Sequence, residues 1–291
     1  MTFVMTFGMT GSLRAELRRM LRWPTMWVLG GTWLVLNLTF GYLFNYLTYN
    51  SDNGTGFDRD TPRPLLLAQM MPAHAPVSLV QGLPMFGGAL LLILGAVAVG
   101  SGYGWGTWKT VFTTGPGRLT AFGGTLSALV VMVTTLIVTT LGLDFAASFL
   151  IAGAENQPAT WPTLLDTAQG LGAGLLIGGM WTLAGVLLGT LTRGPALAVG
   201  LGLVWSLVVE NLLRGVASLL GPVEAVTKLL PGTAAGSLAG AVGAAPQATP
   251  GGTPGVTTIL SGTTALVLLV AYVVVFAGLS ARLTARRDLA G

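Results

Sequence analysis

The sequence predicts an all-α membrane protein whose six transmembrane helices form one domain. Hydrophobic residues make up 52% of the 291 residues and charged residues only 8%, whereas a soluble domain carries about 25% charged residues. Several apolar runs reach the roughly 20 residues that a helix needs to cross a bilayer. No polar stretch is long enough for a separate soluble domain, so residues 1–291 are expected to form a single transmembrane unit.

The composition excludes several kinds of functional site. The chain has no cysteine, which rules out disulfides, thiolate metal sites and cysteine nucleophiles. The single histidine, His74, cannot by itself form a zinc site or a catalytic relay, and we expect it at the surface of an outer loop. We therefore predict no catalytic residue and no metal site. We attribute the net charge of +4 to basic residues that orient the chain in the membrane and not to nucleic-acid binding.

The chain is expected to begin with an amphipathic helix, residues 12–22, with Ser12 as its N-cap. A basic amphipathic helix of this kind lies on the inner membrane surface. The apolar span that follows Pro24 is too long for a cleavable signal peptide, so it should remain as an anchor. The apolar face of the helix is formed by Leu13, Leu17, Met20 and Leu21, and its basic face by Arg14, Arg18 and Arg22.

Polar and proline-rich segments separate the apolar runs. Residues 48–79 are expected to form an external loop with a short helix near 63–71. Residues 215–258 are rich in Gly, Ala, Pro and Thr, and should form two short re-entrant helices, 222–230 and 233–243, followed by a flexible loop. The six predicted spans are residues 25–47, 80–102, 119–151, 164–191, 196–214 and 259–281.

The distribution of basic residues predicts the orientation in the membrane. With both termini in the cytoplasm, ten of the 14 Lys and Arg residues fall on the inner side, as the positive-inside rule requires. The inner residues are Arg14, Arg18, Arg19, Arg22, Lys109, Arg118, Arg193, Arg282, Arg286 and Arg287, and the outer ones are Arg59, Arg63, Arg214 and Lys228. The predicted location is the inner (plasma) membrane.

A glycine-rich segment with a basic end, residues 100–118, joins the second and third spans. Trp105 and Trp108 offer large contact surfaces next to Lys109, and Gly104 and Gly106 let the backbone turn sharply away from the second span. On these residues alone, two interpretations stay open. The segment is either a short amphipathic helix that docks on a cytoplasmic partner or an interfacial loop with an aromatic belt.

The same segment resembles the first cytoplasmic loop in the permease subunits of type 2 ABC transporters, an exporter class also called type V. That loop follows the pattern Glu-x-x-x-Gly-Thr-x-x-x-x-Leu-x-x-x-Pro-x-x-Arg. This chain matches it at Gly106, Thr107, Pro116 and Arg118, and has Gly102 at about the position of the glutamate. The family also has an amphipathic helix before the first span and short helices before the last one. The resemblance therefore covers nearly the whole chain.

The resemblance implies a permease that forms its translocation pathway as a dimer, with a second copy or a homologue. Separate ABC ATPase subunits would bind ATP and Mg²⁺ and dock on residues 12–22 and 103–118. The chain contains no Gly-x-x-x-x-Gly-Lys-Ser/Thr run, so we expect that it binds no cofactor and is not itself an enzyme. The residues implied in the contact with the ATPase are Arg14, Arg18, Tyr103, Trp105, Gly106, Thr107, Trp108, Lys109 and Arg118.

Ionisable residues within membrane spans are functional candidates, and few occur here. Asp144 lies far along the third span and should reach the outer interface. Glu210 and Arg214 are expected to pair at i, i+4, and Asp166 to stabilise the start of the fourth span. No carboxylate is expected at the centre of a span, which argues against a proton- or sodium-driven carrier.

Polar and aromatic side chains within the spans are candidates for a translocation pathway, although hydrogen bonding between helices would explain them equally well. They are Trp33, Asn37, Tyr42, Asn45, Thr134, Trp205 and Ser206. A pathway lined mainly by apolar groups suits export of a hydrophobic or amphipathic compound. Glycines at four-residue spacing in the fourth span favour helix packing within one subunit over a seam between subunits. They are Gly170, Gly174, Gly178, Gly185 and Gly189.

The function predicted from these features is that of the permease subunit of an ABC exporter. Two alternatives from other classes stay open. One is a non-transporting membrane scaffold or assembly factor that uses residues 103–118 as a docking site. The other is an ion-coupled secondary carrier. In every case the lipid bilayer surrounds the chain, and no interaction with nucleic acid is expected.

Overall fold

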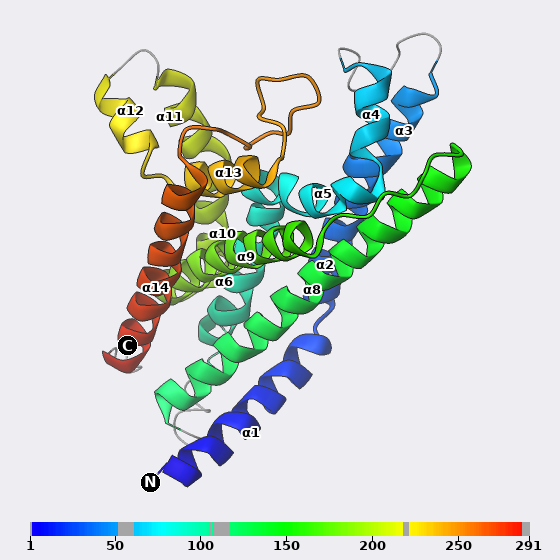
Figure 1. Ribbon diagram of the computed structural model, residues 1–291. Coiled ribbons are helices and arrows are strands. Elements are labelled where there is room, and N and C mark those ends of the chain that lie inside the picture. The colour runs from blue at the N-terminus through cyan, green and yellow to red at the C-terminus, as the bar shows by residue number, and fades with distance from the viewer. Residues whose placement is uncertain (1, 52–60, 105, 107–116, 218–220, 287–291) are drawn as a thin grey trace.

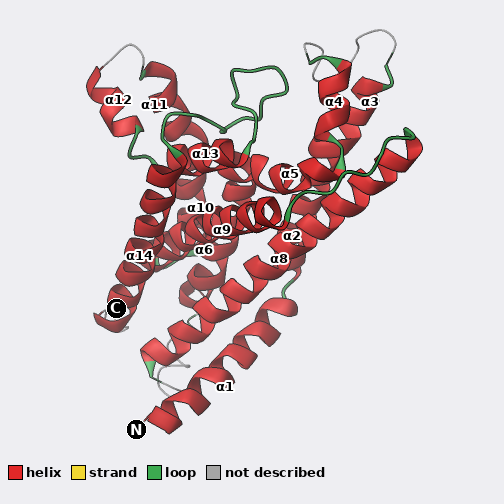
Figure 2. Cartoon of the chain, in the orientation of Figure 1, coloured by secondary structure: helices red, strands yellow, loops and turns green. Residues whose placement is uncertain are grey.

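The computed structural model describes residues 2–51, 61–104, 106, 117–217 and 221–286, with the backbone alone for residues 2–9. The described residues form helices and no strand (Figure 2), which confirms the predicted all-α class. Six helical segments are long and apolar enough to cross a membrane, so the chain is a multi-pass membrane protein. They are Pro24–Tyr49, Pro72–Gly104, Arg118–Ala154, Leu164–Thr192, Pro195–Val216 and Gly262–Arg286.

Three of the six spans are single α-helices and three are composite. The single helices are α8 (Arg118–Ala154), α9 (Leu164–Thr192) and α14 (Gly262–Arg286). The first span consists of α2 (Pro24–Leu38), a π-helical turn η1 (Thr39–Leu43) and α3 (Phe44–Tyr49). The fifth consists of α10 (Pro195–Leu203), a π-helical segment η4 (Val204–Val209) and α11 (Glu210–Val216). A π-turn widens the helix locally and changes the direction of the side chains around it.

The second span begins earlier than the sequence indicated. It consists of η2 (Pro72–His74), α5 (Ala75–Gln81), η3 (Leu83–Gly87) and α6 (Gly88–Gly104). The expected external loop therefore ends before Pro72, and His74 is half-buried and not a surface residue. The reason is tertiary packing, because α5 is covered by α8 and α9, and a short proline-containing helix depends on such contacts.

The helix before the first span, α1 (Thr2–Leu21), is longer than predicted. Ser12 lies in its interior, so the predicted N-cap at this residue is wrong. The Ser12 side chain instead lies against Gly124 of α8, where an added Cβ would come within 2.2 Å of the Ser12 hydroxyl. Figure 1 shows α1 alongside the first half of α8, at the end of the molecule where α14 stops. Its depth in a membrane stays a prediction.

The centre of the molecule is the contact between α6 and α9, the most extensive helix pair among the described residues. An added Cβ at Gly95 would lie 2.0 Å from the carbonyl oxygen of Thr182, and one at Gly185 would lie 2.0 Å from that of Leu92. Glycine at these positions lets the two backbones approach each other directly. The predicted role of the fourth-span glycines in packing within the chain is therefore confirmed.

In the described part of the chain, three short helices lie outside the six spans: α4 (Arg63–Gln69), α12 (Gly221–Thr227) and α13 (Pro231–Val242). Each was predicted within a few residues. Figure 1 shows α4 and α12 at the end of the molecule opposite the start of α1. Every residue from Pro231 to Ala239 of α13 is buried, since α13 packs against α14 and the chain near Gly255 passes directly over Gly236. Entry of α13 into a membrane leaflet stays a prediction.

Candidate functional site

Those predicted coupling residues that the structure describes lie on α1 and at the adjoining ends of α6 and α8. The second span ends at Gly104, and Gly106 adopts a left-handed conformation with φ of 67°. Its amide donates a 3.1 Å hydrogen bond to the carbonyl oxygen of Tyr103, an arrangement that ends a helix. The sharp turn predicted at Gly106 is thus confirmed.

The remaining predicted coupling residues are only partly described. Arg14 and Arg18 are exposed on α1, whereas Tyr103 and Arg118 are half-buried at the ends of α6 and α8. Trp105, Thr107, Trp108 and Lys109 lie outside the described residues. A docking helix over residues 103–118 therefore stays a prediction.

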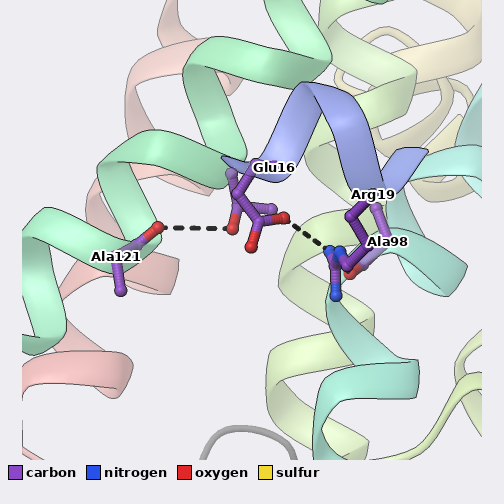
Figure 3. A network of polar contacts seen from close by, with 5 residues as sticks. Glu16, Arg19, Ala98 and Ala121 are labelled. Atoms are coloured by element: carbon purple, nitrogen blue, oxygen red, sulfur yellow. Dashed lines mark hydrogen bonds and ion pairs between the residues drawn. The ribbon is translucent and has the colours of Figure 1, made fainter. Parts of the chain in front are cut away.

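A polar network connects α1 to both α6 and α8 (Figure 3). One guanidinium nitrogen of Arg19 donates a 3.0 Å hydrogen bond to the carbonyl oxygen of Ala98 on α6 and lies 2.7 Å from a carboxylate oxygen of Glu16. Glu16 lies beside the hydroxyl of Thr125 on α8, which in turn donates to the carbonyl oxygen of Ala121 at 3.3 Å. These contacts fasten α1 to the two helices that residues 105–117 join.

The environment of Glu16 affects its protonation. Burial raises the pKa of the Glu16 carboxyl above its ordinary value, and the positive charge of Arg19 and the hydroxyl of Thr125 offset part of that rise. The Arg19 guanidinium also lies over the ring of Trp23, 5.3 Å from its centroid, a favourable cation–π distance. The network is therefore held together by an ion pair, hydrogen bonds and aromatic packing at once.

The first span and α8 are linked by three hydrogen bonds between side chains. The indole of Trp33 donates to Thr140 at 3.0 Å, the amide of Asn37 to Asp144 at 2.6 Å, and the hydroxyl of Tyr46 to Glu155 at 2.9 Å. The sequence separations are 107, 107 and 109 residues. Such nearly constant separations mean that the two helices run parallel and in register.

Asp144 lies in a buried polar cluster with residues of three other elements. Its side chain is fully buried, although the sequence suggested a position at the outer interface. One of its carboxyl oxygens accepts the bond from Asn37. The other oxygen has no hydrogen-bond partner among the described residues, and neither do the hydroxyls of Tyr42 on η1 and Ser78 on α5. Ser78 was missed because the sequence predicted a loop there.

The second buried carboxyl group, Glu210, lies where η4 meets α11. One of its oxygens accepts a 2.9 Å hydrogen bond from the indole of Trp205. The other lies against the start of α13, where an added Cβ on Gly232 would come within 2.0 Å of it. A carboxyl group beside the first turn of a helix is favourably placed for the exposed amide groups there.

The charges of Glu210 and Arg214 interact as expected, but the carboxyl and guanidinium groups form no direct ion pair. The Arg214 guanidinium donates instead to the carbonyl oxygen of Glu210 at 3.3 Å, to the side-chain oxygen of Asn211 at 3.1 Å and to the carbonyl oxygen of Gly255 at 3.5 Å. The i, i+4 spacing places the two residues on one helix face, but the start of α13 directs the carboxyl group away from Arg214.

The other candidate pathway residues lie in different surroundings. Asn45 is half-buried and donates to the carbonyl oxygen of Gly41 within its own helix. Thr134 and Trp205 are exposed, and Ser206 is buried. Trp33, Asn37 and Tyr42 are buried between helices. The described residues therefore include the expected interhelical hydrogen bonds, while a translocation pathway along these side chains stays a prediction.

Comparison of the sequence with protein-family models and with curated proteins finds no match in either set.

Proposed function

We propose that this chain is the membrane-spanning permease subunit of an ATP-driven ABC exporter. The order of the elements supports the proposal: α1 precedes the first span, Gly106 turns the chain out of the second, and α12 and α13 precede the last. Two such chains, or this chain and a homologue, form the pathway around a two-fold axis. Separate ATPase subunits bind ATP and Mg²⁺.

The network around Glu16 and Arg19 is the observation that supports this function most directly. Residues 105–117 connect α6 to α8, and the same two helices are fastened to α1 by Arg19 and Glu16. A partner that pushes on residues 103–118 and on the exposed Arg14 and Arg18 would therefore move α1, α6 and α8 together. Rigid-body movement of packed helices is a common way to transmit such a change.

The orientation and substrate class follow from the same proposal. The end of the molecule that carries the predicted coupling residues faces the cytoplasmic side of the inner membrane. The basic residues of α1 and the basic end of α14 lie at this end. The exported compound is hydrophobic or amphipathic, because the spans expose apolar side chains such as Trp27, Val35 and Val131.

A direct experiment is to purify the tagged chain in mild detergent from its native host and to identify the proteins that accompany it. A stoichiometric ATPase subunit is expected. Replacement of Trp105, Thr107 and Trp108 by alanine should leave ATP hydrolysis in place and abolish ATP-dependent transport of an amphipathic dye. Leu164→Ala, at the exposed first residue of α9, is the control. Unchanged coupling, or a chain that purifies without any nucleotide-binding protein, would contradict the proposal.

The buried carboxyl group of Asp144 favours an ion-coupled secondary carrier as a second candidate. Intramembrane carboxyl groups mark ion pathways in carriers, and Asp144 forms no ion pair with any described residue. In that case transport would follow an ion gradient without an ATPase, and Asp144→Asn would abolish it. Transport that depends on ATP and survives this substitution would exclude the carrier.

A further inference from the structure

An apolar groove lies between α1, α2, α6 and α8. Its volume is about 450 Å³, and nearly all of its lining is hydrophobic. Leu21 and Trp27 on one side of the groove and Val131 on the other are exposed. The groove is therefore accessible from the lipid-facing surface of the protein.

Two glycines of the first span keep the groove open. A Cβ added at Gly31 would meet no atom within 4 Å, and one added at Gly30 would meet only Leu136 at 3.7 Å. Both glycines line the groove. The space exists because these two positions have no side chains, so a larger residue at Gly31 would fill it without a clash.

Two arginines neighbour groove-lining residues in the chain: Arg18 follows Leu17 and Arg22 follows Leu21, and both leucines line the groove. Arg18 and Arg22 are exposed on the last turn of α1 and directly after it, just before the first span begins at Pro24. The indole of Trp27 donates a 2.7 Å hydrogen bond to the carbonyl oxygen of Leu21, which holds the corner between α1 and α2. Because they precede the start of the first span by six and two residues, the two arginines would meet the lipid headgroups, where basic residues attract anionic lipids.

The length of the groove matches one leaflet. Its lining extends from Leu21 along α2 to Leu34, ten residues past the start of the span. At 1.5 Å per residue this distance is about 15 Å, roughly half of the hydrocarbon core of a bilayer. An acyl chain whose headgroup lies beside the arginines would therefore follow the groove to about the middle of the membrane.

We propose that the groove binds an acyl chain of one anionic phospholipid, and that Arg18 and Arg22 bind its phosphate group. A second copy of the chain fits this face less well, because a two-fold contact would add a second pair of these arginines to one interface, and none of the described acidic side chains lines the groove. The inference is independent of the proposed transport function, since it concerns the isolated chain in a lipid environment.

Native mass spectrometry of the full chain tests the proposal with phosphatidylglycerol and phosphatidylcholine that carry identical acyl chains. One phosphatidylglycerol should bind about thirtyfold more tightly than phosphatidylcholine, since each arginine contributes roughly a factor of five near an anionic headgroup. The double variant Arg18→Gln/Arg22→Gln should remove this preference. Arg193→Gln, which changes an exposed arginine between α9 and α10, should keep it.

The acyl-chain part has its own test. Gly31→Leu should weaken the binding of both lipids at least tenfold. Gly142→Leu is the matched control, because Gly142 is exposed on α8 and also has open space at its Cβ, but does not line the groove. It should leave the binding of both lipids unchanged. Equal affinity for the two lipids, or full binding by Gly31→Leu, would overturn the proposal. A lipid-free dimer that Gly31→Leu disrupts would assign the groove to a second copy instead.

Discussion

The side-chain amide of Asn37 donates a 2.6 Å hydrogen bond to the carboxyl group of Asp144 across the parallel contact of α2 and α8. The bond lies between two others of almost the same sequence separation, from Trp33 to Thr140 and from Tyr46 to Glu155. The other carboxyl oxygen of Asp144 has no hydrogen-bond partner in the described part of the chain. The bond from Asn37 is therefore the one that connects the Asp144 side chain to another helix.

A double-mutant cycle should show that Asn37 and Asp144 act as a pair. Asn37→Leu and Asp144→Leu each leave one buried polar group without its partner, which costs about 1–3 kcal/mol of unfolding free energy. The double variant removes both groups, so its loss should be smaller than the sum by about 0.5–3 kcal/mol. Unfolding in mixed detergent micelles measures all four proteins, with the exposed Thr134→Leu as control. Strict additivity would show that the bond contributes no coupling.

Substitution of glycine in α9 should have opposite effects at two positions of the same helix. Gly185→Ala places a Cβ 2.0 Å from the carbonyl oxygen of Leu92. The clash forces α6 away from α9, which should lower the free energy of unfolding by about 1–3 kcal/mol. Gly179→Ala meets no atom within 4 Å and should be neutral or stabilising, because alanine favours the helix over glycine by up to about 1 kcal/mol. Thermal melting in detergent distinguishes the two. Equal melting temperatures would argue against the close contact of α6 and α9.

The stability of the α1 attachment should depend on pH through Glu16. Burial raises the pKa of this carboxyl above the ordinary value of 4.5, so the folded protein binds the proton more tightly than the unfolded chain does. Stability therefore falls as the pH rises through the interval that begins at the ordinary value and ends at the raised one. Glu16→Gln stays neutral and lacks this fall. The difference in melting temperature between the two proteins should therefore change as the pH rises from acidic to neutral. A constant difference between the two would refute the shift.

Much of the architecture could be predicted without any tertiary information. The third, fourth and fifth spans begin and end within about three residues of the predicted positions, because their length and apolar character alone specify a membrane helix. The helices α4, α12 and α13 were also predicted, since proline and glycine mark their ends. The segment from Pro72 to Leu79 was mistaken for a loop, because its helical structure depends on burial against α8 and α9.

The candidate site could be predicted much less completely than the fold. Trp33, Asn37 and Tyr42 were singled out as polar residues in an apolar span. Thr140, which accepts the bond from Trp33, and Ser78, whose buried hydroxyl lies in the cluster around Asp144, were not. The π-helical turns at Thr39–Leu43 and Val204–Val209 also have no clear signal in the residues that form them. Each turn sets the direction of a side chain beside a buried carboxyl group, Tyr42 in one case and Trp205 in the other.

The sequence by itself determined the class of the protein, the number of spans and the glycines that pack the fourth span, because hydrophobic length and residue spacing along one helix are local properties. Only the tertiary structure decided which polar groups meet. Spacing along a helix identifies a face, but it cannot identify the helix that covers that face. Asn37 therefore finds Asp144 only when α2 and α8 lie side by side, and Arg19 reaches Ala98 only when α1 packs against α6.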